Sequence, residues 1–155
     1  MTGGFPAISE LIPHSDAMLL LEHVLEHTPE FTVCRIDVRR STLFADADGS
    51  VPSWLGLEYI AQCAAVHGGL AARDRGEPPR PGLLLGSRRL RLHADRFEAE
   101  PPLEVTARHH RGESGLVAFE GTVRNPRGDV LADGRINLYI LEDWSELARM
   151  IHRDE

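Results

Sequence analysis

Residues 51–72 read VPSWLGLEYIAQCAAVHGGLAA, an almost wholly apolar stretch that carries one carboxylate, Glu58. Pro52 suits the first turn of a helix, because proline has no N–H to lose there and its φ is already helical. A helix from Pro52 to Arg73 would be about 33 Å long. Its apolar residues fall on every face, which is typical of a buried helix. The stretch therefore predicts a long central helix that the rest of the chain must cover.

Glu58 is the one acidic residue in this predicted helix. An unpaired buried carboxylate costs several kcal/mol or gives up its charge. Acids of that kind concentrate in active sites, so Glu58 is the first candidate catalytic residue. The alternative is a structural acid that a backbone group or an arginine satisfies.

The pattern outside this helix predicts an α+β fold with one sheet wrapped around the helix. In residues 31–40, apolar and charged side chains alternate, as in a half-buried strand. Strands are expected at 18–24, 31–40, 83–94, 103–111, 116–124 and 130–141, a helical turn at 8–12 and a small helix at 143–152. With 155 residues, the chain is expected to form one domain. The exposed edges of a sheet of about six strands favour pairing of two copies, so we expect a homodimer.

Composition excludes several classes of function. The net charge of −7 argues against general nucleic-acid binding. The first residues lack a basic leader and no stretch approaches about 18 uninterrupted apolar residues, so a cytoplasmic protein is expected. Cys34 and Cys63 lie in apolar patterns and predict buried thiols in a reducing compartment. No metal or cofactor is expected.

Seven arginines fall within residues 73–96 of this acidic protein. Such a cluster is either a docking patch for an acidic partner or a phosphate, or the solvated face of a strand. The seven are Arg73, Arg75, Arg80, Arg88, Arg89, Arg91 and Arg96.

Three motifs in order resemble the hotdog-fold 3-hydroxyacyl-carrier-protein dehydratases over nearly the whole chain. Residues 12–24, IPHSDAMLLLEHV, resemble the family's opening L-P-H-R-x-P-x-L-L-x-D-R-V. Residues 51–62, VPSWLGLEYIAQ, resemble its helix opening M-P-G-x-L-x-x-E-A-x-A-Q, and residues 115–140 resemble its closing hairpin. The helix opening and the early Pro-His are most similar to the dehydratases of aryl-polyene clusters, which build conjugated polyenes on a carrier protein.

The resemblance implies a single hotdog domain over residues 1–155 that removes water from a 3-hydroxyacyl thioester on acyl carrier protein. It implies that Glu58 is the catalytic carboxylate, followed by Gln62 in the substrate site. Gln62 lies one turn later on the same face of the helix, and the alternative is that it orients its neighbour or bonds to backbone. It also implies that backbone N–H groups near Ser53 and Trp54 bind the thioester oxygen. The expected partners are a carrier protein bearing phosphopantetheine, docked at Arg88, Arg89 and Arg91, and a second copy or another hotdog protein.

The chain departs from the family pattern at the catalytic histidine. Phe44 stands at that position, and Ser53 replaces the glycine that opens the family's helix. His14, in the first motif, is our candidate for the missing group; the alternative is a structural histidine that bonds a backbone carbonyl. His67 lies nine residues after Glu58, which places it about 2.5 turns along the helix and near its opposite side.

Two further functions remain open on the same fold. In a thioesterase, Glu58 would activate water for hydrolysis. In a binding subunit that has lost its histidine, the chain would hold an acyl group beside a catalytic partner.

Overall fold

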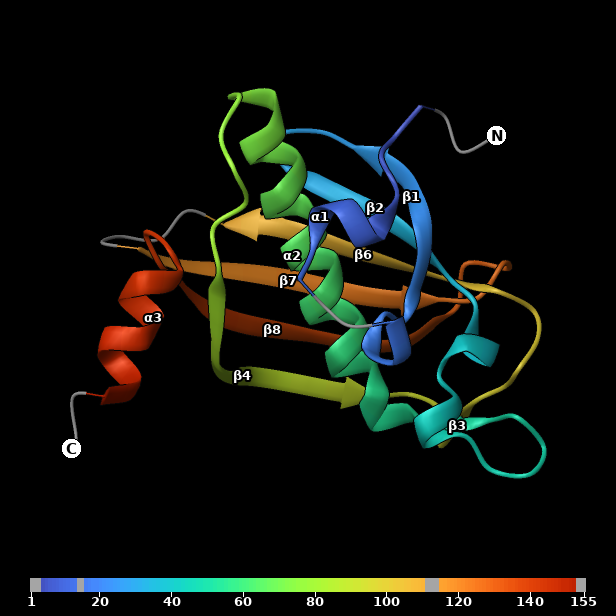
Figure 1. The fold of residues 1–155 in the computed structure, drawn as a ribbon. Helices are drawn as coiled ribbons and strands as arrows, with labels where there is room; N and C mark the ends of the chain where they lie inside the picture. Colours follow the sequence, from blue (N-terminus) through green and yellow to red (C-terminus); the bar gives the residue numbers. More distant parts are fainter. Residues whose placement is uncertain (1–3, 14–15, 111–114, 153–155) are drawn as a thin grey trace.

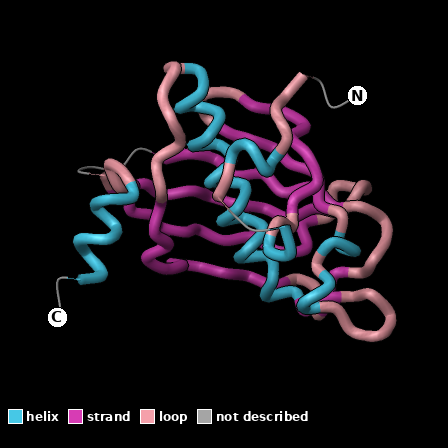
Figure 2. Tube along the Cα trace, viewed as in Figure 1, coloured by secondary structure: helices cyan, strands magenta, loops and turns pink. Residues whose placement is uncertain are grey.

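The structure is a computed structural model that describes residues 4–13, 16–110 and 115–152. Six strands form one antiparallel sheet, and the long helix α2 (Gly56–Asp74) lies across one of its faces (Figure 1). Figure 2 shows the same layers as one plane of strands behind the helix. In sheet order the strands are β1 (Leu21–His27), β2 (Phe31–Ile36), β6 (Leu103–His110), β7 (Leu116–Arg124), β8 (Val130–Ile140) and β4 (Gly82–Leu92). The predicted sheet around one long helix is confirmed.

Shorter elements connect these parts. The described chain opens with α1 (Ile8–Leu11) and ends with α3 (Trp144–Ile151), which lies beside the sheet (Figure 1). A two-stranded sheet and four 3-10 turns complete the fold: β3 (Val51–Pro52), β5 (Arg96–Phe97), η1 (Asp16–Met18), η2 (Val38–Arg40), η3 (Thr42–Phe44) and η4 (Ser53–Leu55).

The core forms where α2 meets the inner face of the sheet. Tyr59, Ile60, Cys63 and Val66 of α2 are fully buried there. Gly121 of β7 permits the close approach, because a Cβ at this position would overlap the side chain of Ile60. The sheet contributes Cys34, Ile36, Val105, Ala107, Val123 and Ile136 to the same core. Burial of this apolar surface holds the helix in the sheet.

The predicted helix start is wrong by four residues. Val51 and Pro52 pair with β5, which holds Pro52 in an extended conformation instead of the first helical turn. Residues 53–55 form the 3-10 turn η4, and α2 begins only at Gly56. Pairing between segments that are distant in sequence therefore overrides the local helix signal.

Two strand boundaries also differ from expectation. The first strand begins at Leu21, because the backbone groups of Met18 and Leu20 bond to the Gln62 side chain. The second ends at Ile36, because Asp37 caps the turn η2 by accepting a hydrogen bond from the Arg39 N–H. In both places a side chain takes backbone groups that a longer strand would need.

Strands β1 and β4 form the two edges of the described sheet. β4 also exposes Leu84, Leu85 and Leu92. An apolar edge strand is a ready partner for another chain. In the described part of the chain, no helix is long and apolar enough to cross a membrane.

Candidate functional site

A cavity of about 1000 Å³ runs along α2. Glu58 lines it near the start of the helix, and His67 lines it further along. Its walls come from α1, the proline-rich segment 78–81, the start of β4 and the inner faces of β7 and β8. The helix side is lined by small residues, namely Ala61, Ala64, Ala65, Gly68, Gly69, Ala71 and Ala72. These small side chains leave room for an elongated apolar ligand.

Glu58 lies half-buried at this cavity, so the expectation of a fully interior carboxylate is corrected. Gln62, one turn later, donates a hydrogen bond from Nε2 to Oε1 of Glu58 at 3.0 Å. The α2 helix therefore presents its acid to the cavity with one oxygen held in place.

Gln62 was predicted in the substrate site, with orientation of its neighbour as the alternative, and the structure supports the alternative. Its side chain is 0% exposed. Oε1 accepts a hydrogen bond from the Leu20 N–H at 3.1 Å, and Nε2 donates to the Met18 carbonyl at 2.7 Å as well as to Glu58. With its donors and acceptor engaged by the chain, Gln62 is a positioning residue that ties Glu58 to the entry of β1.

Ser53 and Trp54, the predicted donors to the thioester oxygen, are arranged differently from expectation. The Ser53 N–H donates to the carbonyl of Asp95 at 3.3 Å. Trp54 is 53% exposed, and its ring packs edge-on against Phe44 with 5.9 Å between centroids. Neither is among the described residues that line the cavity. The pairing of β3 with β5 directs this turn elsewhere.

The position of the family histidine holds an aromatic side chain that cannot transfer a proton. Phe44 lies half-buried at the end of η3, against Trp54. His14, our candidate replacement, lies outside the described residues, so its role stays a prediction.

Three histidines gather at the part of the cavity remote from Glu58, a cluster that the sequence analysis missed. The buried Thr32 hydroxyl lies 2.7 Å from Nδ1 of His27 and 2.8 Å from Nδ1 of His67. The ring of His109 stacks on His67, with 5.7 Å between centroids. A hydroxyl has one proton, so Thr32 donates to one imidazole and accepts from the other. Because β1, β2, β6 and α2 each supply one member, no local spacing reveals the cluster.

Burial keeps the central imidazole neutral. It lowers the pKa of His67 to about 4, and the neighbouring His27 and His109 act in the same direction, against the backbone of Pro29. Burial also lowers the pKa of His27, which Asp74 partly offsets. His67 and His27 are thus uncharged at neutral pH.

This cluster makes folding stability sensitive to acid. In the unfolded chain a histidine binds a proton below about pH 6.5, whereas folded His67 binds one only near pH 4. The lowered pKa of His67 therefore leaves the free energy of unfolding unaffected above pH 6.5. As the pH falls from 6.5 toward 4, the free energy of unfolding decreases by at most about 3 kcal/mol. Urea unfolding of wild type and His67→Gln between about pH 7.5 and about pH 5 measures this decrease.

The His67→Gln variant should lose much of this pH dependence, and His93→Gln, a change at an exposed residue, should keep it. An unchanged pH slope in His67→Gln would assign the acid sensitivity to other groups.

The two cysteines are core thiols, as predicted. Both are fully buried, and their sulfur atoms lie 3.8 Å apart between α2 and β2. Burial raises the pKa of Cys63 well above its usual value. A thiol of this kind is a poor nucleophile at neutral pH.

The predicted docking arginines lie exposed along β4. Arg89 pairs in register with Arg135 of β8, and Arg91 pairs with Asp133. Ala132, Gly134 and Ile136 of β8 are buried on the inner face, so residues 133 and 135 and their partners face away from α2. Arg135 is a cationic neighbour that the sequence analysis did not single out.

The chain matches a known protein family. Residues 6–150 match the family model described as ApeP-like, ApeP dehydratase. The chain belongs to the ApeP-like dehydratase family. No curated protein sequence matches this ApeP-like chain significantly.

Solved structures relate this ApeP-like dehydratase to the hotdog fold. A chain of the dehydratase heterocomplex ApeI:P from Xenorhabdus doucetiae is 28% identical, with a TM-score of 0.87; the match covers 96% of this chain and 99% of that chain. AziG from S. sahachiroi is similar at 16% identity and TM-score 0.63, over 84% and 98% of the two chains. A hypothetical thioesterase with coenzyme A from Streptococcus pneumoniae shares the fold at 12% identity and TM-score 0.58, over 77% and 84%.

Proposed function

We propose that this chain removes water from a 3-hydroxyacyl thioester to give the trans-2-enoyl thioester during synthesis of a polyene chain. The observation that carries the proposal is Glu58, held by Gln62 at the wall of an elongated cavity lined by small residues. Membership of the ApeP-like dehydratase family supports the same reaction.

In the proposed reaction one base and one acid suffice. The Glu58 carboxylate takes the proton from C2, the C2–C3 double bond forms, and the C3 hydroxyl leaves as water after it receives a proton. Binding of the acyl chain excludes water from the apolar cavity, which strengthens the carboxylate as a base. His14 is our candidate for the acid, on the strength of its place in the first motif.

The substrate is proposed to arrive on a carrier protein, with Arg88, Arg89 and Arg91 supplying positive charge on an acidic chain. A second hotdog chain is the other proposed partner. The position of β4 at an edge of the described sheet supports pairing, as does the similarity to a chain of a dehydratase heterocomplex.

One observation favours a second candidate function, that of a supporting subunit. Phe44 stands where the dehydratases that this sequence resembles have a histidine. This chain therefore offers no proton-transfer group at that position. In that case the chain would hold acyl groups or complete the site of a catalytic partner. Hydrolysis of the thioester by water activated at Glu58 is the third possibility.

Mass spectrometry of a 3-hydroxyacyl carrier protein, incubated with the purified chain, separates these functions. Loss of one water from the acyl chain is expected. Release of the free acid would establish a thioesterase instead. Unchanged substrate, followed by loss of water only when a second hotdog dehydratase is added, would establish the supporting subunit.

A further inference from the structure

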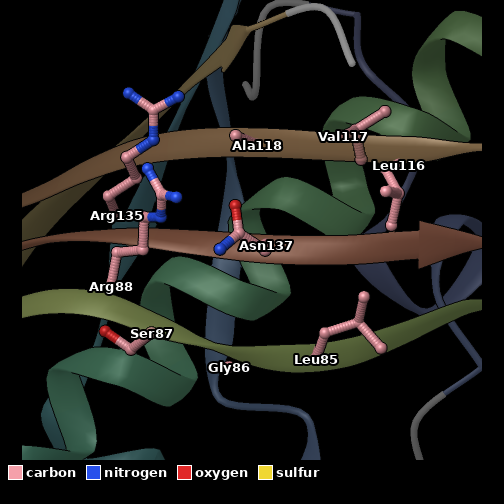
Figure 3. A pocket seen from close by; sticks show the side chains of 9 residues that line it. All are labelled: Leu85, Gly86, Ser87, Arg88, Leu116, Val117, Ala118, Arg135 and Asn137. Atoms are coloured by element: carbon pink, nitrogen blue, oxygen red, sulfur yellow. The ribbon is translucent and has the colours of Figure 1, made fainter. Parts of the chain in front are cut away.

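A shallow groove of about 460 Å³ lies on the outer face of the sheet, across β4, β7 and β8 (Figure 3). It is distinct from the cavity along α2, which lies under the inner face. Its lining is polar at one end and apolar at the other, and comprises Leu85, Gly86, Ser87, Arg88, Leu116, Val117, Ala118, Arg135 and Asn137.

Two arginines form the polar end of this groove. Figure 3 shows the side chains of Arg88 and Arg135 extending in the same direction, and both residues line the groove. Nη1 of Arg135 lies 3.5 Å from Oε1 of Glu120, and Nε is buried with no hydrogen-bond partner among the described residues. No described carboxylate forms an ion pair with Arg88. Two adjacent cations with one weak carboxylate contact attract an external anion.

Irregular pairing of β4 concentrates these charges on one face. The register of β4 against β8 shifts between Ser87 and Arg89, so Arg88 is an extra residue beside the Arg89 to Arg135 pair. In a bulge of this kind, two residues of one strand oppose a single residue of its partner. Strict alternation would separate Arg88 from Arg89, whereas the bulge places both near Arg135.

The other end of the groove is apolar and open. Leu85 is 56% exposed and Leu116 is 46% exposed, and Figure 3 shows both side chains at the end of the groove away from the two arginines. A partner that fits the groove therefore carries acidic groups beside an apolar side chain.

We propose that this groove docks the acidic surface of the carrier protein that delivers the thioester, with carboxylates at Arg88 and Arg135 and an apolar side chain over Leu85 and Leu116. The proposal rests on the proposed function for its partner. Charge complementarity favours this occupant, because the groove presents two arginines that together have one carboxylate contact among the described residues, at 3.5 Å, on a chain of net charge −7. A second hotdog chain would pair along the edge of β4 and leave its outer face open.

The groove lies next to the cavity of Glu58 along the chain. Residues 85–88 of β4 line the groove, and residues 82–84 of the same strand line the cavity of Glu58. Four residues along a strand span about 13 Å. The groove and the cavity are thus adjacent along β4, on opposite faces of the sheet.

Titration calorimetry with the carrier protein lacking its phosphopantetheine arm tests the docking directly. The double variant Arg88→Glu, Arg135→Glu is expected to raise the Kd at least about tenfold. Lysine at both positions should restore most of the affinity, since the charge is kept. Arg127→Glu, the same substitution at a single arginine of the β7 to β8 hairpin, is the control and should bind like wild type.

Steady-state kinetics separates docking from chemistry. The double variant should raise KM for the carrier-bound substrate about tenfold and leave turnover of a short pantetheine thioester unchanged. Leu85→Ser should weaken carrier binding about threefold. Unaltered carrier affinity in the double variant, or an equal loss in Arg127→Glu, would overturn the docking proposal. If neither the wild type nor any variant turns over the short thioester, the dehydratase proposal fails. The calorimetry still tests the docking proposal in that case.

Discussion

Replacing Glu58 with glutamine is expected to lower the rate of dehydration by about 10² to 10⁴, the range for loss of a general acid or base. Glutamine keeps the size of the side chain and an oxygen that accepts the hydrogen bond from Gln62. It loses the carboxylate that takes the C2 proton. The loss should therefore appear in kcat, with the thermal unfolding temperature close to that of wild type.

Glu10 provides a matched control, because it is a second acid that lines the same cavity. Glu10→Gln removes the same charge from the cavity wall, and we expect nearly full activity. If Glu58→Gln retained more than about a tenth of the wild-type rate, Glu58 would be a structural acid and the chemistry would lie elsewhere.

Substitution of His14 by alanine is expected to lower kcat by about 10² or more, because the leaving hydroxyl loses its proton donor. Phe44 cannot supply this proton, so the reaction needs a donor from another part of the chain or from a partner. Steady-state turnover of the carrier-bound substrate measures the effect, and His23→Ala, which removes a histidine from β1, is the comparison.

Rates like those of wild type in His14→Ala would remove His14 from the mechanism. The same assay should then be repeated with a second hotdog dehydratase added. A rise in rate upon its addition would indicate that the partner supplies the acid.

Much of the fold was predictable because it depends on periodic burial. β7 has the predicted limits, and the central helix and the six strands occupy their expected places in the chain order. The boundaries failed where distant segments compete for backbone groups. Pairing with β5 removes Pro52 from the helix, and Gln62 holds the entry of β1.

The candidate site was likewise predictable only in part from the sequence. Glu58 was identifiable because a single carboxylate in an apolar helix is conspicuous and lies in a motif. The bonds of Gln62 to the backbone of Met18 and Leu20, and the bond of the Ser53 N–H to the Asp95 carbonyl, depend on contacts that no local pattern encodes. The histidine cluster combines residues of β1, α2 and β6, with Thr32 of β2 between two of its rings.

The sequence by itself determined the buried helix, its acid, the wrapped sheet and the family motifs, since each is written in residues that are close along the chain. Only the tertiary structure decided which groups share a cavity and which face the arginines occupy. The physical reason is that hydrogen bonds and bulges between distant strands set these positions. Arg88 and Arg135 lie 47 residues apart and meet because of the register between β4 and β8.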